Sequence, residues 1–260
     1  MKIISYSDLH LEFGYMPLKT SDADVLILAG DIITFKDFTP LQKIFESWKK
    51  PIIYVVGNHE YYTFSSMHAN DETFKDWLKN YPHVHYLQNS AIAIDGVQFF
   101  GGTMWTDFNN ADPLAMFSAR RALNDYRAIM TDDDNYLTPL YTTILHQEFV
   151  EKLMEWFEKT LEGPRVVVTH HSPVMNPTTK YHNSAITAAF NSLDMISYIE
   201  RYQPCLWVYG HTHECDDQKI GDTRIISNQR GYERIPGHVE CQDFDKGGKC
   251  IEISTNKSGI

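Results

Sequence analysis

Short apolar runs alternate with amphipathic segments through the first part of the chain. The apolar runs occur at 3–6, 25–29 and 52–56. Residues 40–50 and 74–81 instead place their apolar side chains at the spacing of one helix face. Short strands with helices between them are typical of a largely parallel sheet that is buried on both faces. The sequence therefore predicts alternating strands and helices in this part.

The pattern changes after the third apolar run. Residues 91–102 predict a β-hairpin, because the pair Asp95-Gly96 suits a tight turn between two strands. Helices are predicted near 149–157 and 193–199 from their apolar spacing. Further strands and a second hairpin are predicted at 165–169, 206–209, 218–227 and 250–254. Strands with helices before and after them indicate two packed sheets covered by helices.

Residues 106–147 interrupt this rhythm with a helical stretch at 113–130 and an acidic, turn-like segment at 131–135. The chain has no Pro/Gly/Ser tract, low-complexity run or internal repeat that would mark a linker. A chain of 260 residues can bury one sizeable core. We therefore expect one domain over 1–260, with a cap-like insertion at about 106–147.

Charge and composition limit the partners. The formal net charge of −11 repels nucleic acid and anionic membranes over most of the surface, although two bound divalent cations would reverse that sign locally. No apolar run approaches the ~20 residues of a membrane span, and the N-terminus has no signal-peptide pattern. The four cysteines form no Cys-x-x-Cys pair, and Cys205 and Cys250 are expected in the core. These features predict a cytoplasmic protein with no membrane partner.

Five polar motifs stand where apolar runs stop. They are Asp8-Leu9-His10, Gly30-Asp31, Gly57-Asn58-His59-Glu60, His170-His171 and Gly210-His211-Thr212-His213. Asp8 and His10 are two residues apart, so both side chains lie on the same side of an extended strand end. The glycine before Asp31 lets the backbone turn sharply and leaves the carboxylate unobstructed. The motifs therefore bring metal-binding and acid-base side chains to the ends of neighbouring strands.

The donor types define the chemistry. Carboxylate, amide and imidazole groups without a thiolate favour Mn, Fe, Zn, Ni or Co over Ca or Mg alone. Two such ions, ~3.5–4 Å apart, can activate a bridging water and hold the attacking and leaving oxygens of an in-line displacement at phosphorus. Each motif alone has a simpler explanation as a turn or a helix cap, but five such coincidences at strand ends would be required. Together they predict a site for two divalent transition-metal ions.

In this order, the motifs resemble those of the calcineurin-like metallophosphoesterase superfamily, and they extend from Asp8 to His213. The resemblance implies an α/β (α+β) fold, a four-layer sandwich of two packed mixed β-sheets flanked by helices. It also implies that Asp31 bridges two metals and that His59 is no ligand but protonates the leaving group. The implied ligands are Asp8, His10 and His213 for one metal and Asn58, His170 and His211 for the other.

The residues next to the motifs indicate which branch of the superfamily the chain resembles. Protein Ser/Thr phosphatases have Gly and Asp-Arg-Gly at positions where this chain has Leu11 and Ile32-Ile33-Thr34. The lipid-A-precursor pyrophosphatase branch shares Asp-Leu-His-Leu but has Arg-Asp in place of His59-Glu60. The segment from Ile225 to Tyr232 resembles the small bacterial and phage-type group of predicted phosphoesterases. The resemblance thus implies a reaction and leaves the substrate open.

Candidate substrate contacts lie next to the motifs and in the insertion. Loops beyond strand ends collect binding residues, which points to Trp105, to His171 and to segment 173–191. Tyr61 and Tyr62 could stack on a base, although packing in the core explains them as well. Arg120 could reach the substrate from a cap, although a solvated helix face is the simpler explanation.

These observations predict a dimetal-dependent phosphoesterase in which a metal-bridging hydroxide attacks phosphorus and His59 is the proton donor. The expected partner is a small phosphate ester; phosphatase and phosphodiesterase activities and the oligomeric state stay open. One alternative is a nuclease or DNA-repair-type phosphodiesterase, which the acidic charge disfavours. The other is a non-catalytic binding module on the same fold, which would be expected to lack ligands. None of the motif ligands is missing.

Overall fold

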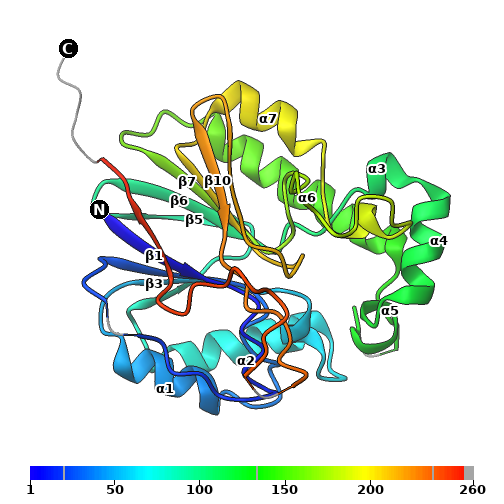
Figure 1. The fold of residues 1–260 in the computed structure, drawn as a ribbon, viewed down its shortest axis with the longest axis horizontal. Coiled ribbons are helices and arrows are strands. Elements are labelled where there is room, and N and C mark those ends of the chain that lie inside the picture. Colours follow the sequence, from blue (N-terminus) through cyan, green and yellow to red (C-terminus); the bar gives the residue numbers. More distant parts are fainter. Residues whose placement is uncertain (20, 133, 236, 255–260) are drawn as a thin grey trace.

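Two mixed β-sheets pack face to face in the computed structural model, which describes residues 1–19, 21–132, 134–235 and 237–254 (Figure 1). The first sheet has the strand order β11-β1-β2-β3-β4, and the second has the order β5-β6-β7-β8-β10-β9. Helices cover the outer faces of both sheets (Figure 1). The predicted sandwich of two mixed sheets flanked by helices is confirmed.

Most strands run parallel within each sheet. The first sheet contains β1 (Lys2–Tyr6), β2 (Val25–Ala29), β3 (Ile52–Val55), β4 (Val84–Tyr86) and β11 (Lys249–Glu252). The second contains β5 (Ser90–Ile94), β6 (Val97–Gly102), β7 (Arg165–Thr169), β8 (Leu206–Tyr209), β9 (Asp216–Ile220) and β10 (Thr223–Ser227). Only the edge strands β11, β5 and β9 pair antiparallel with their described neighbours. The parallel strands of each sheet therefore end at one edge, which is where ligands collect in such sheets.

The central strands are apolar throughout because both of their faces are covered. In β2, Ile27 faces the second sheet and packs in one cluster with Val168 of β7. Its neighbours Leu26 and Leu28 point the other way, into a cluster with Phe45 of a covering helix. This alternation with a period of two explains why buried strands read as continuous apolar runs.

Four helices cover the two sheets and complete the layers. They are α1 (Thr39–Ser47) and α2 (Met67–Leu78) on the first sheet, and α6 (Pro139–Phe157) and α7 (Met195–Tyr202) on the second. Two short 3₁₀ helices, η1 (His59–Tyr61) and η2 (Thr187–Ala189), lie in the connections. Helix α1 buries Leu41, Ile44 and Phe45, which share one face at helical spacing. The Ser66 hydroxyl accepts the Ala69 N–H and caps α2.

Residues 106–147 are mostly helical. They form α3 (Phe108–Ala111), α4 (Pro113–Ala122), α5 (Asp125–Ala128) and the start of α6. The side chains of Asp112 and Thr138 accept backbone N–H groups and cap α4 and α6, respectively. Helices α3 to α5 lie beyond one end of the two sheets, away from the N-terminus (Figure 1).

Both predicted hairpins are present, as β5–β6 and β9–β10. Asp95 and Gly96 have φ values of 46° and 81°, which a tight hairpin turn requires. The expectation for Cys250 is wrong: it is exposed, because it alternates with the buried Ile251 on the edge strand β11, and Cys205 is only half-buried. None of the described helices combines the length and the apolar character of a membrane span.

Candidate metal centre

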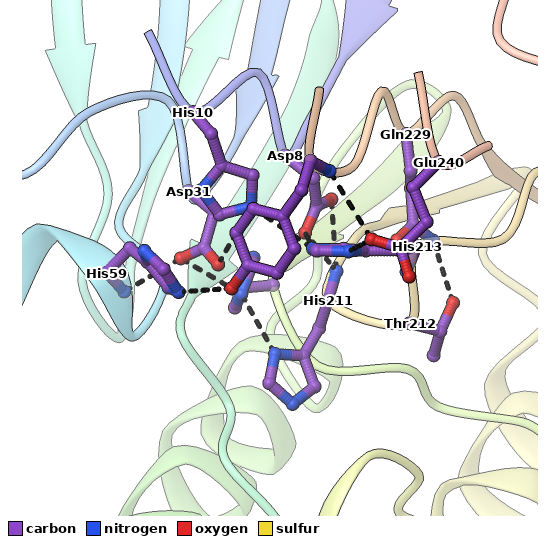
Figure 2. Close-up of polar contacts among 12 residues, drawn as sticks. Asp8, His10, Asp31, His59, His211, Thr212, His213, Gln229 and Glu240 are labelled. Carbon is purple, nitrogen blue, oxygen red and sulfur yellow. Dashed lines mark hydrogen bonds and ion pairs between the residues drawn. The ribbon is translucent and has the colours of Figure 1, made fainter. Parts of the chain in front are cut away.

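The five motifs converge at the strand ends. Figure 2 shows Asp8, His10, Asp31, His59, His211 and His213 gathered there. Asp8 and His10 follow β1, Asp31 follows β2, Asn58 follows β3, His170 follows β7, and His211 and His213 follow β8. The backbone is left-handed, with φ between 47° and 74°, at Asp8, His10, Asp31, His211 and His213. The extended strand end expected at Asp8 and His10 is therefore wrong, because β1 already ends at Tyr6, although both side chains reach the same group of donors. Residues other than glycine adopt this conformation when the surrounding structure holds them there, and such residues cluster at functional sites.

The glycine of each Gly-containing motif permits close approach of a neighbouring side chain. A Cβ atom at Gly57 would lie 2.2 Å from Asp31 Oδ1, and one at Gly210 would lie 2.6 Å from Asp8 Oδ2. A Cβ atom at Gly30 would lie 2.4 Å from His170 Nδ1. Any other residue would therefore push carboxylate or imidazole groups out of the cluster.

One group of donor atoms combines Asp8, His10, Asp31 and His213, whose ligating atoms all lie within 4.8 Å of one another. The Nε2 atoms of His10 and His213 are 3.1 Å apart. His213 Nε2 lies 3.5 Å from Asp8 Oδ1, and His10 Nε2 lies 3.9 Å from Asp31 Oδ2.

A second group combines Asp31 with His170 and His211, and Asn58 adds an amide oxygen. Asn58 Oδ1 lies 3.0 Å from His170 Nε2 and 3.1 Å from His211 Nδ1. His170 Nε2 is 3.3 Å from Asp31 Oδ1. Asp31 thus directs Oδ2 toward the first group and Oδ1 toward the second.

The hydrogen bonds of three histidines show which ring nitrogen of each is free to bind a cation. His170 Nδ1 lies 3.0 Å from the carbonyl of Ala29, and His213 Nδ1 lies 2.7 Å from Glu240 Oε2. His10 Nδ1 similarly faces Glu12 Oε1 at 3.3 Å. Because these oxygens only accept hydrogen bonds, each Nδ1 donates and each neutral ring turns a lone pair on Nε2 into the cluster.

The lone pairs of neighbouring donors would repel one another without a cation or a proton between them. Donors bound to one ion at ~2.0–2.2 Å lie about 3.0–3.5 Å apart when the angle between them is about 90–110°. Most of the donor separations in both groups fall in this range. The residues present therefore fit two divalent cations.

Electrostatics divide the histidines into two classes. Burial opposes protonation of His170 and His59, but Asp31 together with Asp8 at His170, and with Glu12 at His59, outweighs it and raises their pKa values to about 10 and about 9. Burial instead lowers the pKa of His171 and that of His211 well below the ordinary value. A proton and a cation compete for the same lone pair, so cation binding at His170 releases a proton.

His59 stands beside the cluster and not among the closest donor pairs. Its Nδ1 lies 3.3 Å from Glu12 Oε1, and its Nε2 lies 2.9 Å from the Tyr232 hydroxyl. Its ring stacks on that of Tyr62 with centroids 4.4 Å apart. His10, Glu12 and His59 are also close enough to hold an ion, but Glu12 there accepts from both imidazoles.

Two further carboxylates organise the motif loops. Glu60 accepts the N–H groups of Gly57 and Asp31 at 2.7 and 2.9 Å, and so ties two motifs together. Burial raises the pKa of Glu60 to about 7. Asp125, from α5 of the insertion, accepts the Asn58 side-chain N–H at 2.9 Å and turns the Asn58 oxygen toward the histidines.

Sequence reasoning did not identify Glu12, Asp125, Tyr232 or Glu240 as parts of the site. Glu12 follows His10 at the same spacing of two residues that separates Asp8 from His10, which is a usable signal. Tyr232 lies at the end of the segment that carries the resemblance to small phosphoesterases. Nothing in the sequence marks Asp125 or Glu240, because each is recognised only by its contact with a distant motif.

Four of the candidate substrate contacts lie in different places. His171 and Trp105 are buried behind the ligands, with the His171 ring 4.1 Å from that of His211. Tyr61 is fully buried and its hydroxyl donates to Asp71, so it packs in the core and does not face a substrate. Arg120 is exposed on α4 and does not line the cavity of about 300 Å³ above the ligands. That cavity is instead reached by residues 122–125 of the insertion.

A family model described as calcineurin-like phosphoesterase matches residues 1–215. The chain is 28% identical to an uncharacterised protein, L509, of Acanthamoeba polyphaga mimivirus, with 89% of this chain and 92% of that protein covered. It is 24% identical to a UPF0046 protein of Caenorhabditis elegans, over 82% of this chain and 64% of that protein. Among solved structures, a phosphopantetheinyl hydrolase of Mycobacterium tuberculosis covers 89% of both chains with a TM-score of 0.68 and 17% identity, a likeness of fold.

Proposed function

Because this chain belongs to the calcineurin-like phosphoesterase family, we propose that it is a dimetal-dependent hydrolase of small phosphate esters. The observation that carries the proposal is the position of Asp31. Its two carboxylate oxygens face two separate groups of histidine nitrogens, one at 3.9 Å and the other at 3.3 Å. A carboxylate placed in this way is suited to bridge two cations. When bound, the cations would supply Lewis acidity to water and to the phosphoryl oxygens.

The proposed roles of the other residues follow from their contacts. His59 donates a proton from Nε2 to the oxygen of the leaving group as the bond from that oxygen to phosphorus breaks. Water supplies the new oxygen on phosphorus. Glu12 accepts from His59 Nδ1 and keeps the ring directed at the cavity. Tyr232, which contacts His59 Nε2, must move aside or share this nitrogen when the substrate binds.

The substrate is proposed to be small. The cavity above the ligands has a volume of about 300 Å³, which suits one phosphate ester group and its immediate substituents. The insertion is proposed to act as a cap, since residues 122–125 line this cavity. The acidic net charge of −11 is unsuited to a long polyanion. A cytoplasmic location stays a prediction, and the choice between monoesters and diesters stays open.

A substrate panel tests the proposal. Chelated protein is reconstituted separately with Mn, Fe, Zn, Ni or Co and assayed on phosphomonoesters, cyclic nucleotides, phosphodiesters, 4′-phosphopantetheine and single-stranded and duplex DNA. We expect metal-dependent hydrolysis of one class of small ester. Absence of hydrolysis with every metal would contradict the proposal. Cleavage of DNA in preference to all small esters, with salt-sensitive binding, would support the nuclease alternative instead.

A further inference from the structure

A second cavity opens beside the metal centre on the side of His59. Its volume is about 830 Å³, compared with about 300 Å³ for the cavity above the ligands. The two cavities share the lining residues His59, Tyr62, Asn124, Tyr232 and Arg234. The larger cavity is therefore the neighbouring part of the same site.

Aromatic rings line this second cavity. Phe13 is 66% exposed, and its ring centroid lies 5.8 Å from that of Tyr232. Tyr62 lies on the other side of His59, with its ring stacked on the imidazole. An exposed phenylalanine in the wall of a cavity offers a flat apolar surface on which a planar group can stack.

Two positively charged side chains, Lys36 and Arg234, also line the cavity. Lys36 belongs to the loop after β2, and Arg234 belongs to the segment after β10. Each of them contacts an aromatic ring. Lys36 Nζ lies 4.9 Å from the centroid of the Phe64 ring, and Arg234 Cζ lies 5.7 Å from the centroid of the Tyr232 ring. Within the described part of the chain neither cation has an ion-pair partner. Both side chains are exposed and can bind an anion.

The two acidic residues in the same walls are already engaged. Glu12 accepts from the imidazoles of His10 and His59. Glu233 accepts the Gly237 N–H at 2.6 Å and pairs with Arg230. Their charges are therefore partly satisfied within the protein, whereas those of Lys36 and Arg234 remain available to a ligand in a chain of net charge −11.

We propose that this cavity binds the leaving group of the substrate, and that this group carries a planar ring and a second anionic group. The inference rests on the proposed function, because the leaving oxygen must lie within hydrogen-bond reach of His59 Nε2. A leaving group attached at that oxygen extends into the cavity beyond His59. The ring lies against Phe13, and the second anion lies between Lys36 and Arg234. Nucleoside bisphosphates belong to this chemical class.

Kinetics on four esters test the proposal with the metal-reconstituted, full-length protein. Adenosine 3′,5′-bisphosphate carries a ring and a second phosphate, adenosine 5′-monophosphate and p-nitrophenyl phosphate carry only a ring, and glycerol 3-phosphate carries neither. We expect kcat/KM to be highest for the bisphosphate. In the double variant Lys36→Ala/Arg234→Ala, kcat/KM for the bisphosphate should fall by about five- to tenfold, mainly through KM. The fall for glycerol 3-phosphate should be several-fold smaller.

Phe13→Ala tests recognition of the planar ring independently of recognition of the second anionic group. It should lower kcat/KM by about fivefold for the three esters that contain a ring, by loss of stacking, and should affect glycerol 3-phosphate less. The matched controls are Phe117→Ala, an exposed phenylalanine on α4, and Lys79→Ala/Lys152→Ala. These controls should leave the kinetics unchanged. Equal losses on all four esters, or no loss on any, would overturn the proposal.

A binding measurement separates this proposal from the proposed function. Adenosine 5′-monophosphate is the product that the bisphosphate would leave after loss of its 3′-phosphate. Calorimetric titration of this nucleotide into chelated full-length protein requires neither metal nor hydrolysis. We expect binding that weakens by about fivefold in Phe13→Ala and in Lys36→Ala/Arg234→Ala. If no ester is hydrolysed, this result still supports a binding site for a planar ring with an anionic group, while the proposed function fails. Binding that both variants leave unchanged would reject it even if hydrolysis occurs.

Discussion

The ligand set and the wall around it are built in different ways. The ligand set comprises the seven side chains that follow strand ends, Asp8, His10, Asp31, Asn58, His170, His211 and His213. The wall comprises Glu12, Asp125, Tyr232 and Glu240, which touch the ligand set or His59. The ligands are placed by strand ends and glycine turns close to them in sequence. Apart from Glu12, which lies two residues after His10, the wall is placed by contacts between distant segments, such as Tyr232 with His59 and Asp125 with Asn58.

This difference predicts different losses. Removal of a ligand should abolish cation binding, because its donor atom has no substitute. Removal of a wall residue should leave every donor in place but loosen its orientation, with graded losses in affinity or rate. The contrast teaches that the donor atoms are placed by short local motifs, whereas the orientation of those donors depends on long-range packing.

The largest effect is expected from Asp31→Asn, within the ligand set. Loss of the shared carboxylate should remove cations from both donor groups and lower kcat by about three orders of magnitude. Steady-state kinetics with metal analysis checks this. Asp76→Asn, an exposed carboxylate on α2, is the control. Full activity of Asp31→Asn in the presence of a chelator would contradict the role of this residue.

His59→Asn should separate proton transfer from metal binding. We expect kcat to fall by about 10²- to 10⁴-fold, the usual contribution of a general acid, while the metal content stays at the wild-type value. His68→Asn, an exposed histidine on α2, should change neither quantity. Loss of a metal together with activity in His59→Asn would show that His59 is a ligand.

Asp125→Ala tests whether the wall acts on the ligand set. It removes the acceptor that holds the Asn58 amide at 2.9 Å. We expect the affinity for one of the two cations to fall by about 10- to 100-fold, with the other cation retained. A competition titration with a chromophoric chelator measures both affinities. Asp125→Asn, which keeps an acceptor oxygen, should restore most of the affinity, and Asp132→Ala serves as the control. Equal weakening of both cations would contradict a role through Asn58.

The smallest effect is expected on stability, from Asp217, a carboxylate that lies away from both the ligand set and the wall. Arg224, and then Lys249, outweigh burial and lower the pKa of Asp217 to about 2. A lowered pKa stabilises the fold above the unfolded value, and this stability is lost as pH falls through the folded pKa. Asp217 is 38% exposed, so Asp217→Asn should cost no more than about 1 kcal/mol at pH 7. The free energy of unfolding in urea should differ less and less between Asp217→Asn and the wild type as pH falls below about 4. A difference in the free energy of unfolding that grows as pH falls would contradict a lowered pKa of Asp217.

The sequence predicts more of the ligand set than of the wall. The sheets, both hairpins and the convergence of the five motifs follow from apolar periodicity and from glycine turns. The three-residue strand β4 is too short to give a period, and the exposure of Cys250 depends on the edge position of β11. The contact of Asp125 with Asn58 joins residues 67 positions apart, and no local pattern encodes it. Tyr61 and Tyr62 are adjacent and chemically alike, yet only Tyr62 lines the site.

Metal stoichiometry tests the central claim most directly. Full-length protein is reconstituted separately with Mn, Fe, Zn, Ni or Co, dialysed against metal-free buffer and analysed by inductively coupled plasma mass spectrometry. The arrangement of Asp31 between two donor groups predicts two ions per chain. One ion per chain, or none with any of the five candidate metals, would contradict a dimetal centre.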